Sequence, residues 1–146
     1  MDSRAVVRSY RDLIVWQQAM ALAAACYNAT KSFPPSEMYG LTSQIRRSAA
    51  SVAANIAEGN GRENTGSYIH ALRIAQGSLK ELETQVLLAE TVELLKKVDS
   101  DHLLDACDGV GRLLRALNPG AAGKTVAMKT FALLPTPDSL LPAERA

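Results

Sequence analysis

Apolar residues recur every three or four positions through four segments of the chain, and this periodicity constrains the fold more than any other feature. Such spacing places apolar side chains on one face of a helix, whereas a strand would need strict alternation. The longest seam lies in a helix predicted to begin near Asn64 or Thr65 and to end near Val92. Its members step by 3, 4, 3, 4 and 3 residues, as in a heptad repeat. They are Leu72, Ala75, Leu79, Leu82, Val86 and Ala89.

The preceding part of the chain predicts two further helices. The first runs over about residues 12–30 with Asp12 as its N-cap, and its apolar stripe is Leu13, Trp16, Met20, Ala23 and Tyr27. The second runs over about residues 37–58 with Ser36 as its N-cap, and its stripe is Leu41, Ile45, Ala49, Val52 and Ile56. Small residues fill positions 48–54, so another helix can approach closely there.

A fourth helix is predicted over about residues 100–117, with the stripe Leu103, Ala106, Val110, Leu113 and Leu117. Proline or glycine follows the first, second and fourth of these helices: Phe33-Pro34-Pro35-Ser36, Gly59-Asn60-Gly61 and Asn118-Pro119-Gly120. Four amphipathic helices with short connections predict an all-α, antiparallel four-helix bundle over residues 12–118. Residues 1–11 form a basic arm, and residues 119–146, with four of the six prolines, are expected to be a flexible tail.

Composition excludes several classes of protein. A net charge of +1 over 146 residues argues against a histone-like nucleic-acid binder. Cys26 and Cys107 lie 81 positions apart without a Cys/His cluster, so we expect two small buried hydrophobes, with a disulfide as the alternative. The longest apolar stretch, Ala19–Tyr27, is too short to span a bilayer, and no signal peptide is evident. A cytoplasmic protein without a membrane partner is therefore expected.

Charge is distributed unevenly along the sequence. Residues 80–108 sum to −5, whereas residues 1–11 sum to +2 and residues 112–146 to +3. These charges are either solvated helix faces or complementary faces that meet between subunits. Opposite faces meeting head-to-tail generate rings.

Two groups of polar residues are candidate contact sites. Arg46 and Arg47, with Arg62 and Arg73 on neighbouring surface, are a candidate phosphate-binding patch; pairing with acidic residues is the alternative. The second group is a polar cluster between the second and third helices, expected to set helix register or a subunit contact. It comprises Gln44, Ser51, Asn55, Glu58, Gly77, Ser78, Glu81 and Gln85.

Helices antiparallel about a turn near residue 62 would place Arg47 opposite Gly77, whose missing side chain leaves room for a long neighbour. Gln44 would then lie opposite residues 79–80. An enzyme is not expected: Glu58 and Glu81 have ordinary cap or surface roles, and a di-metal bundle would need Glu-x-x-His pairs, which do not occur. We therefore expect no catalytic residue, metal or cofactor.

Three motifs occur in order: Leu13-Ile14-Val15-Trp16-Gln17, YGLTSQIRRSAASVAANIAEG over residues 39–59, and AQGSLKELETQ over residues 75–85. With Phe33-Pro34 before Glu37, they resemble the family of proteins encoded in intervening sequences of bacterial 23S ribosomal RNA genes, over about residues 10–118. The resemblance implies an up-and-down, left-handed bundle that assembles into a homopentamer. It also implies similarity to the accessory proteins of diversity-generating retroelements, which associate with a reverse transcriptase and nucleic acid. No enzymatic activity is implied.

The motif positions look structural or interfacial under this resemblance; they include Arg46, Arg47 and Gly59 beside the polar cluster. The sequence therefore predicts a non-enzymatic, oligomeric binding or scaffolding module whose partner is RNA, DNA or a reverse-transcriptase-like protein. The alternative is a purely structural or protein-interaction homo-oligomer without nucleic-acid binding.

Overall fold

The computed structural model describes residues 9–62 and 64–118. Within them it contains no strand and four long helices, α1 (Ile14–Thr30), α2 (Leu41–Asn60), α3 (Thr65–Thr91) and α4 (Lys97–Leu117). Two 3-10 turns, η1 (Tyr10–Asp12) and η2 (Pro35–Glu37), precede α1 and α2. The predicted all-α class is confirmed. The predicted tail, residues 119–146, and most of the basic arm, residues 1–8, lie outside the described residues.

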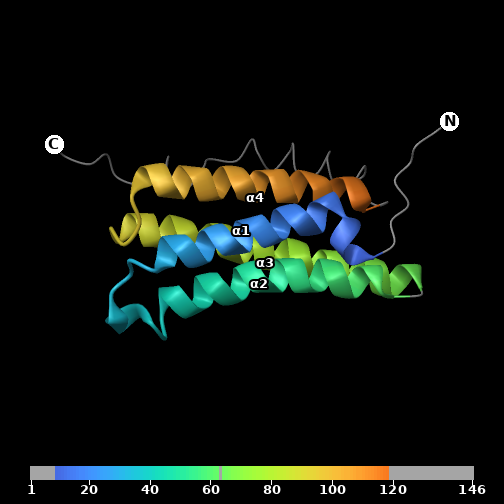
Figure 1. Cartoon of the computed structure of the whole chain (residues 1–146), viewed down its shortest axis with the longest axis horizontal. Helices are drawn as coiled ribbons and strands as arrows, with labels where there is room; N and C mark the ends of the chain where they lie inside the picture. Colours follow the sequence, from blue (N-terminus) through green and yellow to red (C-terminus); the bar gives the residue numbers. More distant parts are fainter. Residues whose placement is uncertain (1–8, 63, 119–146) are drawn as a thin grey trace, which may run out of the picture. The chain divides into compact units, whose positions relative to one another are not determined.

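The packing described below belongs to the unit Met1–Leu114, the first of two into which the chain divides. There the helices lie side by side (Figure 1), and all four contribute side chains to one hydrophobic core. The predicted stripes of α2 and α3 are buried throughout, so these two predictions are confirmed. The two helices come close at Gly59, where an added Cβ would lie 3.0 Å from the Cβ of Ala71.

Two predicted helix caps are wrong. The Ser9 side chain accepts a hydrogen bond from the Arg11 N–H, and the Ser9 N–H donates to Asp12 Oδ2, so both side chains cap η1 and α1 begins later. Glu37 takes the role assigned to Ser36, because its Oε2 accepts the N–H of Leu41 at 3.1 Å. In both cases a 3-10 turn moves the helix start downstream. The cap at Asn64 is confirmed, since its Oδ1 accepts the Ser67 N–H at 2.8 Å.

The inward faces of α1 and α4 differ from those predicted. Met20 and Tyr27 of the α1 stripe are each 46% exposed, and the buried side instead presents Val15, Ala19, Leu22 and Cys26. In α4 the predicted Leu103 and Val110 are buried, and Cys107 and Leu114 complete the buried face. Ala106 and Leu113 are only partly buried against the core, and Leu117 is 38% exposed. Apolar residues surround α1 on nearly every side, so its periodicity fits several faces and the neighbouring helices select one.

Cys26 and Cys107 are both buried and free, which confirms the prediction of small buried hydrophobes and excludes the disulfide. Burial raises the pKa of the Cys26 thiol from its ordinary value of 9.0 to about 12. Burial likewise raises the pKa of Cys107 to about 12, with smaller contributions from Cys26 and nearby carboxylates. Both thiols are therefore protonated and poorly nucleophilic in the folded protein.

We expect the free energy of unfolding to fall as the pH rises from about 9 towards 12, because the thiols ionise in the unfolded chain before they ionise in the folded one. Urea unfolding across this pH window measures the loss. A Cys26→Ala/Cys107→Ala variant should show a shallower alkaline decline, which isolates the thiols from Tyr68, whose pKa burial also raises. An identical decline in the two proteins would contradict this account.

Candidate functional site

A polar cluster joins α2 to α3. Ser51 Oγ and Ser78 Oγ lie 2.8 Å apart, and Asn55 Nδ2 donates to the backbone oxygen of Ser51 at 2.8 Å and to its Oγ at 3.1 Å. Ser48 Oγ donates to Gln85 Oε1 at 2.9 Å, with both residues buried. The sequence analysis did not include Ser48, although its three-residue step from Ser51 was the available signal. These bonds satisfy polar groups that the tight packing of small residues removes from water.

The register between α2 and α3 differs from the prediction. The contacts pair Ser48 with Gln85, Ser51 with Ser78 and Gly59 with Ala71, so residue numbers rise along α2 as they fall along α3. The prediction placed facing residues at equal distances along the chain on either side of a turn near residue 62. The observed partners of the α2 residues lie farther toward the C-terminal end of α3. No heavy atom lies within 4 Å of a Cβ added to Gly77, so Gly77 makes no space for Arg47.

A solvent-open hollow of about 460 Å³ lies over this cluster, and we call it the α2–α3 hollow. Its lining residues are Gln44, Arg47, Ser48, Ser51, Ser78 and Glu81. The structure thus brings together six residues, five of which the sequence analysis had selected. The hydroxyl, amide and guanidinium groups of this lining are hydrogen-bond donors, and the Glu81 carboxylate is an acceptor. The lining includes neither histidine nor cysteine.

Two of the four candidate arginines have partners within the chain. Arg46 Nε donates to Thr30 Oγ1 at 2.9 Å, and its guanidinium lies 4.7 Å from the centroid of the Tyr27 ring, so it binds α1. Arg62 pairs with Glu58 one turn earlier in an exposed ion pair. The Arg62–Glu58 pair is the pairing with an acidic residue that the sequence analysis held as the alternative, whereas Arg46 binds a hydroxyl group and an aromatic ring.

Arg47 and Arg73 remain available to a partner. Both are exposed, and neither forms a hydrogen bond or ion pair with the residues that the structure describes. Arg47 lines the α2–α3 hollow, whereas Arg73 lies on α3 five residues before Ser78, which places it about 7–8 Å away along the helix axis and about 140° away around it.

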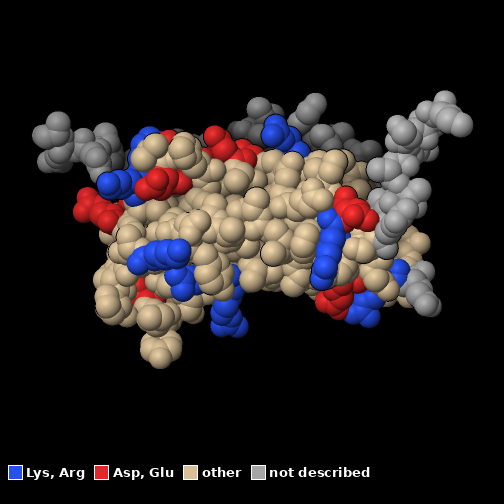
Figure 2. Space-filling view, in the orientation of Figure 1, with Lys and Arg blue, Asp and Glu red and all other residues tan. Residues whose placement is uncertain are grey.

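Sequence reasoning missed an apolar groove between α1 and α2, which we call the α1–α2 groove. It has a volume of about 490 Å³. Its walls are aromatic and its floor is mostly alanine: Tyr10, Trp16, Met20, Ala23, Ala24, Tyr27, Ala50, Ala53, Ala54 and Ala57. The stripe of Trp16, Met20 and Tyr27 was assigned to the core, and its partial exposure creates the groove. Figure 2 shows this face with few charged side chains between groups of charge at its ends.

Other kinds of site find little support in the described residues. Across residues 9–62 and 64–118, no three His, Cys, Asp or Glu side chains are grouped to hold a metal ion. In the same ranges, no helix is both long and apolar enough to cross a membrane. The carboxylate of Glu58 is engaged by Arg62, and that of Glu81 lies at the α2–α3 hollow.

The sequence matches the family described as 23S rRNA-intervening sequence protein over residues 11–116. The chain belongs to this family. The match spans the first three long helices and nearly all of α4, so all the residues of the α2–α3 hollow and all those of the α1–α2 groove except Tyr10 lie inside the region that defines the 23S rRNA-intervening sequence proteins.

A solved structure shows the same fold. It is a protein of unknown function from the S23 ribosomal protein family of Bacteroides thetaiotaomicron, with 20% sequence identity and a TM-score of 0.66. The alignment covers 73% of this chain and 99% of that one. A comparison with curated proteins finds no match. Membership of the 23S rRNA-intervening sequence proteins therefore assigns the fold and leaves the role to be argued from the surface.

Proposed function

We propose that the chain is a cytoplasmic, non-enzymatic, homo-oligomeric binding or scaffolding module that contacts RNA, DNA or a nucleic-acid enzyme such as a reverse transcriptase. Its helices form an up-and-down, left-handed bundle, and its copies assemble as a pentamer. The observation that carries the nucleic-acid contact is the exposure of Arg47, in the lining of the α2–α3 hollow, and of Arg73 on α3, neither of which forms a hydrogen bond or ion pair with the residues that the structure describes. Two free, buried thiols are in keeping with a reducing compartment.

The chemistry of the α2–α3 hollow suits a nucleotide chain better than a simple anion. Guanidinium, hydroxyl and amide donors bind phosphate oxygens. Glu81 would repel a phosphate but accepts hydrogen bonds from a ribose 2′-hydroxyl or an exocyclic base amine. A strand that crosses α3 would contact Arg73 with one phosphate and the hollow with another nucleotide.

We expect an Arg47→Ala/Arg73→Ala variant to bind single-stranded RNA or DNA at least about tenfold more weakly at low salt, because two phosphate contacts are lost. Fluorescence anisotropy over a salt series measures both the affinity and its salt dependence, whose slope should fall by about 2. Arg62→Ala is the matched control, since Arg62 already pairs with Glu58, and it should bind within about twofold of the wild type. No binding by the wild type at low salt, or equal binding by both variants, would refute the nucleic-acid contact.

The second candidate is a purely structural or protein-interaction homo-oligomer, and the exposed α1–α2 groove favours it. Apolar surface of this kind on a soluble domain marks a protein contact more often than a nucleic-acid contact. Affinity capture from the native host, followed by mass spectrometry, separates the two candidates. A nucleic-acid enzyme among the captured proteins would favour the first, and its absence together with failed anisotropy would favour the second.

A further inference from the structure

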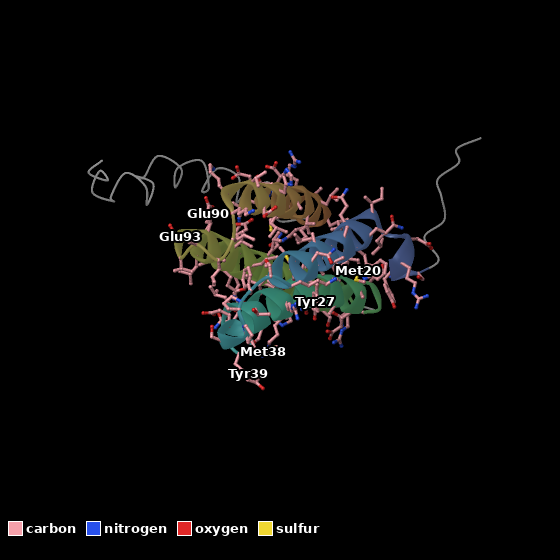
Figure 3. All side chains as sticks on the ribbon, turned by 60° about the vertical axis from the view of Figure 1, so that its left-hand side comes forward. Met20, Tyr27, Met38, Tyr39, Glu90 and Glu93 are labelled. Carbon is pink, nitrogen blue, oxygen red and sulfur yellow. The ribbon has the colours of Figure 1, made fainter. Side chains whose placement is uncertain are left out.

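Two apolar side chains project from the connection between α1 and α2. Tyr39 is 95% exposed and Met38 is 53% exposed. Figure 3 shows both at the end of the helices, with Tyr39 pointing away from them. We call this pair the Met38–Tyr39 knob. An aromatic ring that touches almost nothing in its own chain is apolar surface that a partner would cover favourably.

The backbone holds the knob in a defined conformation. The N–H groups of Glu37 and Met38 donate to the oxygens of Pro34 and Pro35 at 2.9 and 3.1 Å, and the Gly40 N–H donates to Glu37 O at 3.0 Å. The Glu37 carboxylate also caps the first turn of α2. Little backbone entropy would be lost when such a segment docks, which favours binding.

The α1–α2 groove is concave where the knob is convex. None of the described residues that line the groove is charged, and its volume is about 490 Å³. The knob cannot be filling the groove of its own chain, because Tyr39 is almost fully exposed. Figure 3 shows Met20 and Tyr27 of the groove along α1 and the knob beyond the helix end.

A cationic group lies beside the groove and a carboxylate lies beside the knob. The guanidinium of Arg46 lies 4.7 Å from the centroid of the Tyr27 ring, and that of Arg11 lies 5.9 Å from the centroid of Tyr10, so a cation stacks on aromatic walls of the groove. Beside the knob is the carboxylate of Glu37. Such complementarity orients two surfaces as they associate.

We propose that the α1–α2 groove binds the Met38–Tyr39 knob of a second copy of this chain, in a head-to-tail contact. Each copy presents one groove and one knob on different surfaces, so the interface is heterologous and can continue around a ring. The inference rests on the self-association in the proposed function and assigns the surfaces that make it. It leaves the α2–α3 hollow open for the nucleic-acid contact.

Light scattering of the full chain tests this interface. At concentrations where the wild type exceeds its monomer mass of 15.6 kDa, Tyr39→Ser and Ala54→Lys should each return to that mass, with self-association at least about tenfold weaker. Tyr39 and Ala54 are exposed, so both variants should retain the wild-type circular dichroism. Tyr39→Phe keeps the apolar ring, and Val98→Ser removes an exposed apolar side chain from α4, so both should assemble like the wild type.

A mixture of the two defective variants is the decisive measurement. Tyr39→Ser keeps an intact groove and Ala54→Lys keeps an intact knob, so a heterologous contact predicts a one-to-one pair of copies on mixing. A monomeric wild type, an assembled Tyr39→Ser variant, or a mixture that stays monomeric would each overturn the inference. The anisotropy of Arg47→Ala/Arg73→Ala reports on nucleic acid alone, so failure there would refute that contact and leave the interface standing.

Discussion

Leu82→Ala is expected to lower the free energy of unfolding by about 2–5 kcal/mol, because it removes a fully buried side chain and leaves a cavity. Leu82 lies in the middle of the α3 seam, has no exposed surface and belongs to the core shared by all four helices. Its neighbours on the seam are also buried, so the site has little freedom to collapse around the smaller side chain. Urea unfolding followed by circular dichroism measures the loss.

Leu88→Ala is the matched control, since Leu88 lies on the same helix and is about half exposed. This change should cost less than about 1 kcal/mol, because little of the side chain leaves an apolar environment. Equal losses of unfolding free energy for the two variants would show that the burial of a side chain on α3 does not determine how much that side chain contributes to stability.

Gly59→Leu is expected to destabilise the protein by about 1–3 kcal/mol through overpacking. A Cβ at this position would lie 3.0 Å from the Ala71 Cβ and 3.6 Å from the Tyr68 backbone oxygen, so α2 and α3 would have to separate. The polar contacts farther along this interface, between Ser51 and Ser78 and between Ser48 and Gln85, depend on the same approach. Urea unfolding measures the effect.

Gly77→Ala should act in the opposite direction. Gly77 lies in the interior of α3, and nothing lies within 4 Å of an added Cβ, so alanine brings only its better helix propensity. We expect a gain of about 0.5–1 kcal/mol in the free energy of unfolding. A loss at Gly77, or a gain for Gly59→Leu, would contradict the assignment of the close approach to Gly59.

The seams of α2 and α3 were predictable because their apolar and polar residues are well separated around the helix. Ile45, Val52, Leu79 and Leu82 each fall on the buried face at the predicted position. The breaks at Pro34 and Gly61 were equally clear, because proline and glycine act locally. Cap positions were less predictable, since η1 and η2 form through local turns that the helical period does not reveal.

The candidate site was predictable only in part. The polar spacing along α2 and α3 identified Arg47, Ser51, Ser78 and Glu81, which line one hollow. The register did not follow from the length of the turn, because two helices can slide along each other until their small residues fit. The partners of Arg46 could not be predicted, because Tyr27 and Thr30 belong to α1 and are far from Arg46 in the sequence.

The sequence by itself determined that this chain forms four helices, where they are interrupted, and which face of α2 and α3 is buried, because these properties depend on residues within a few turns of one another. Tertiary structure alone decided the inward faces of α1 and α4, the offset between α2 and α3, and the exposure of Trp16, Met20 and Tyr27 in a groove. In α1 alanine and larger apolar residues occur on nearly every side. Its orientation is therefore selected by how closely the neighbouring helices pack, and the surplus apolar surface remains outside, where a partner can cover it.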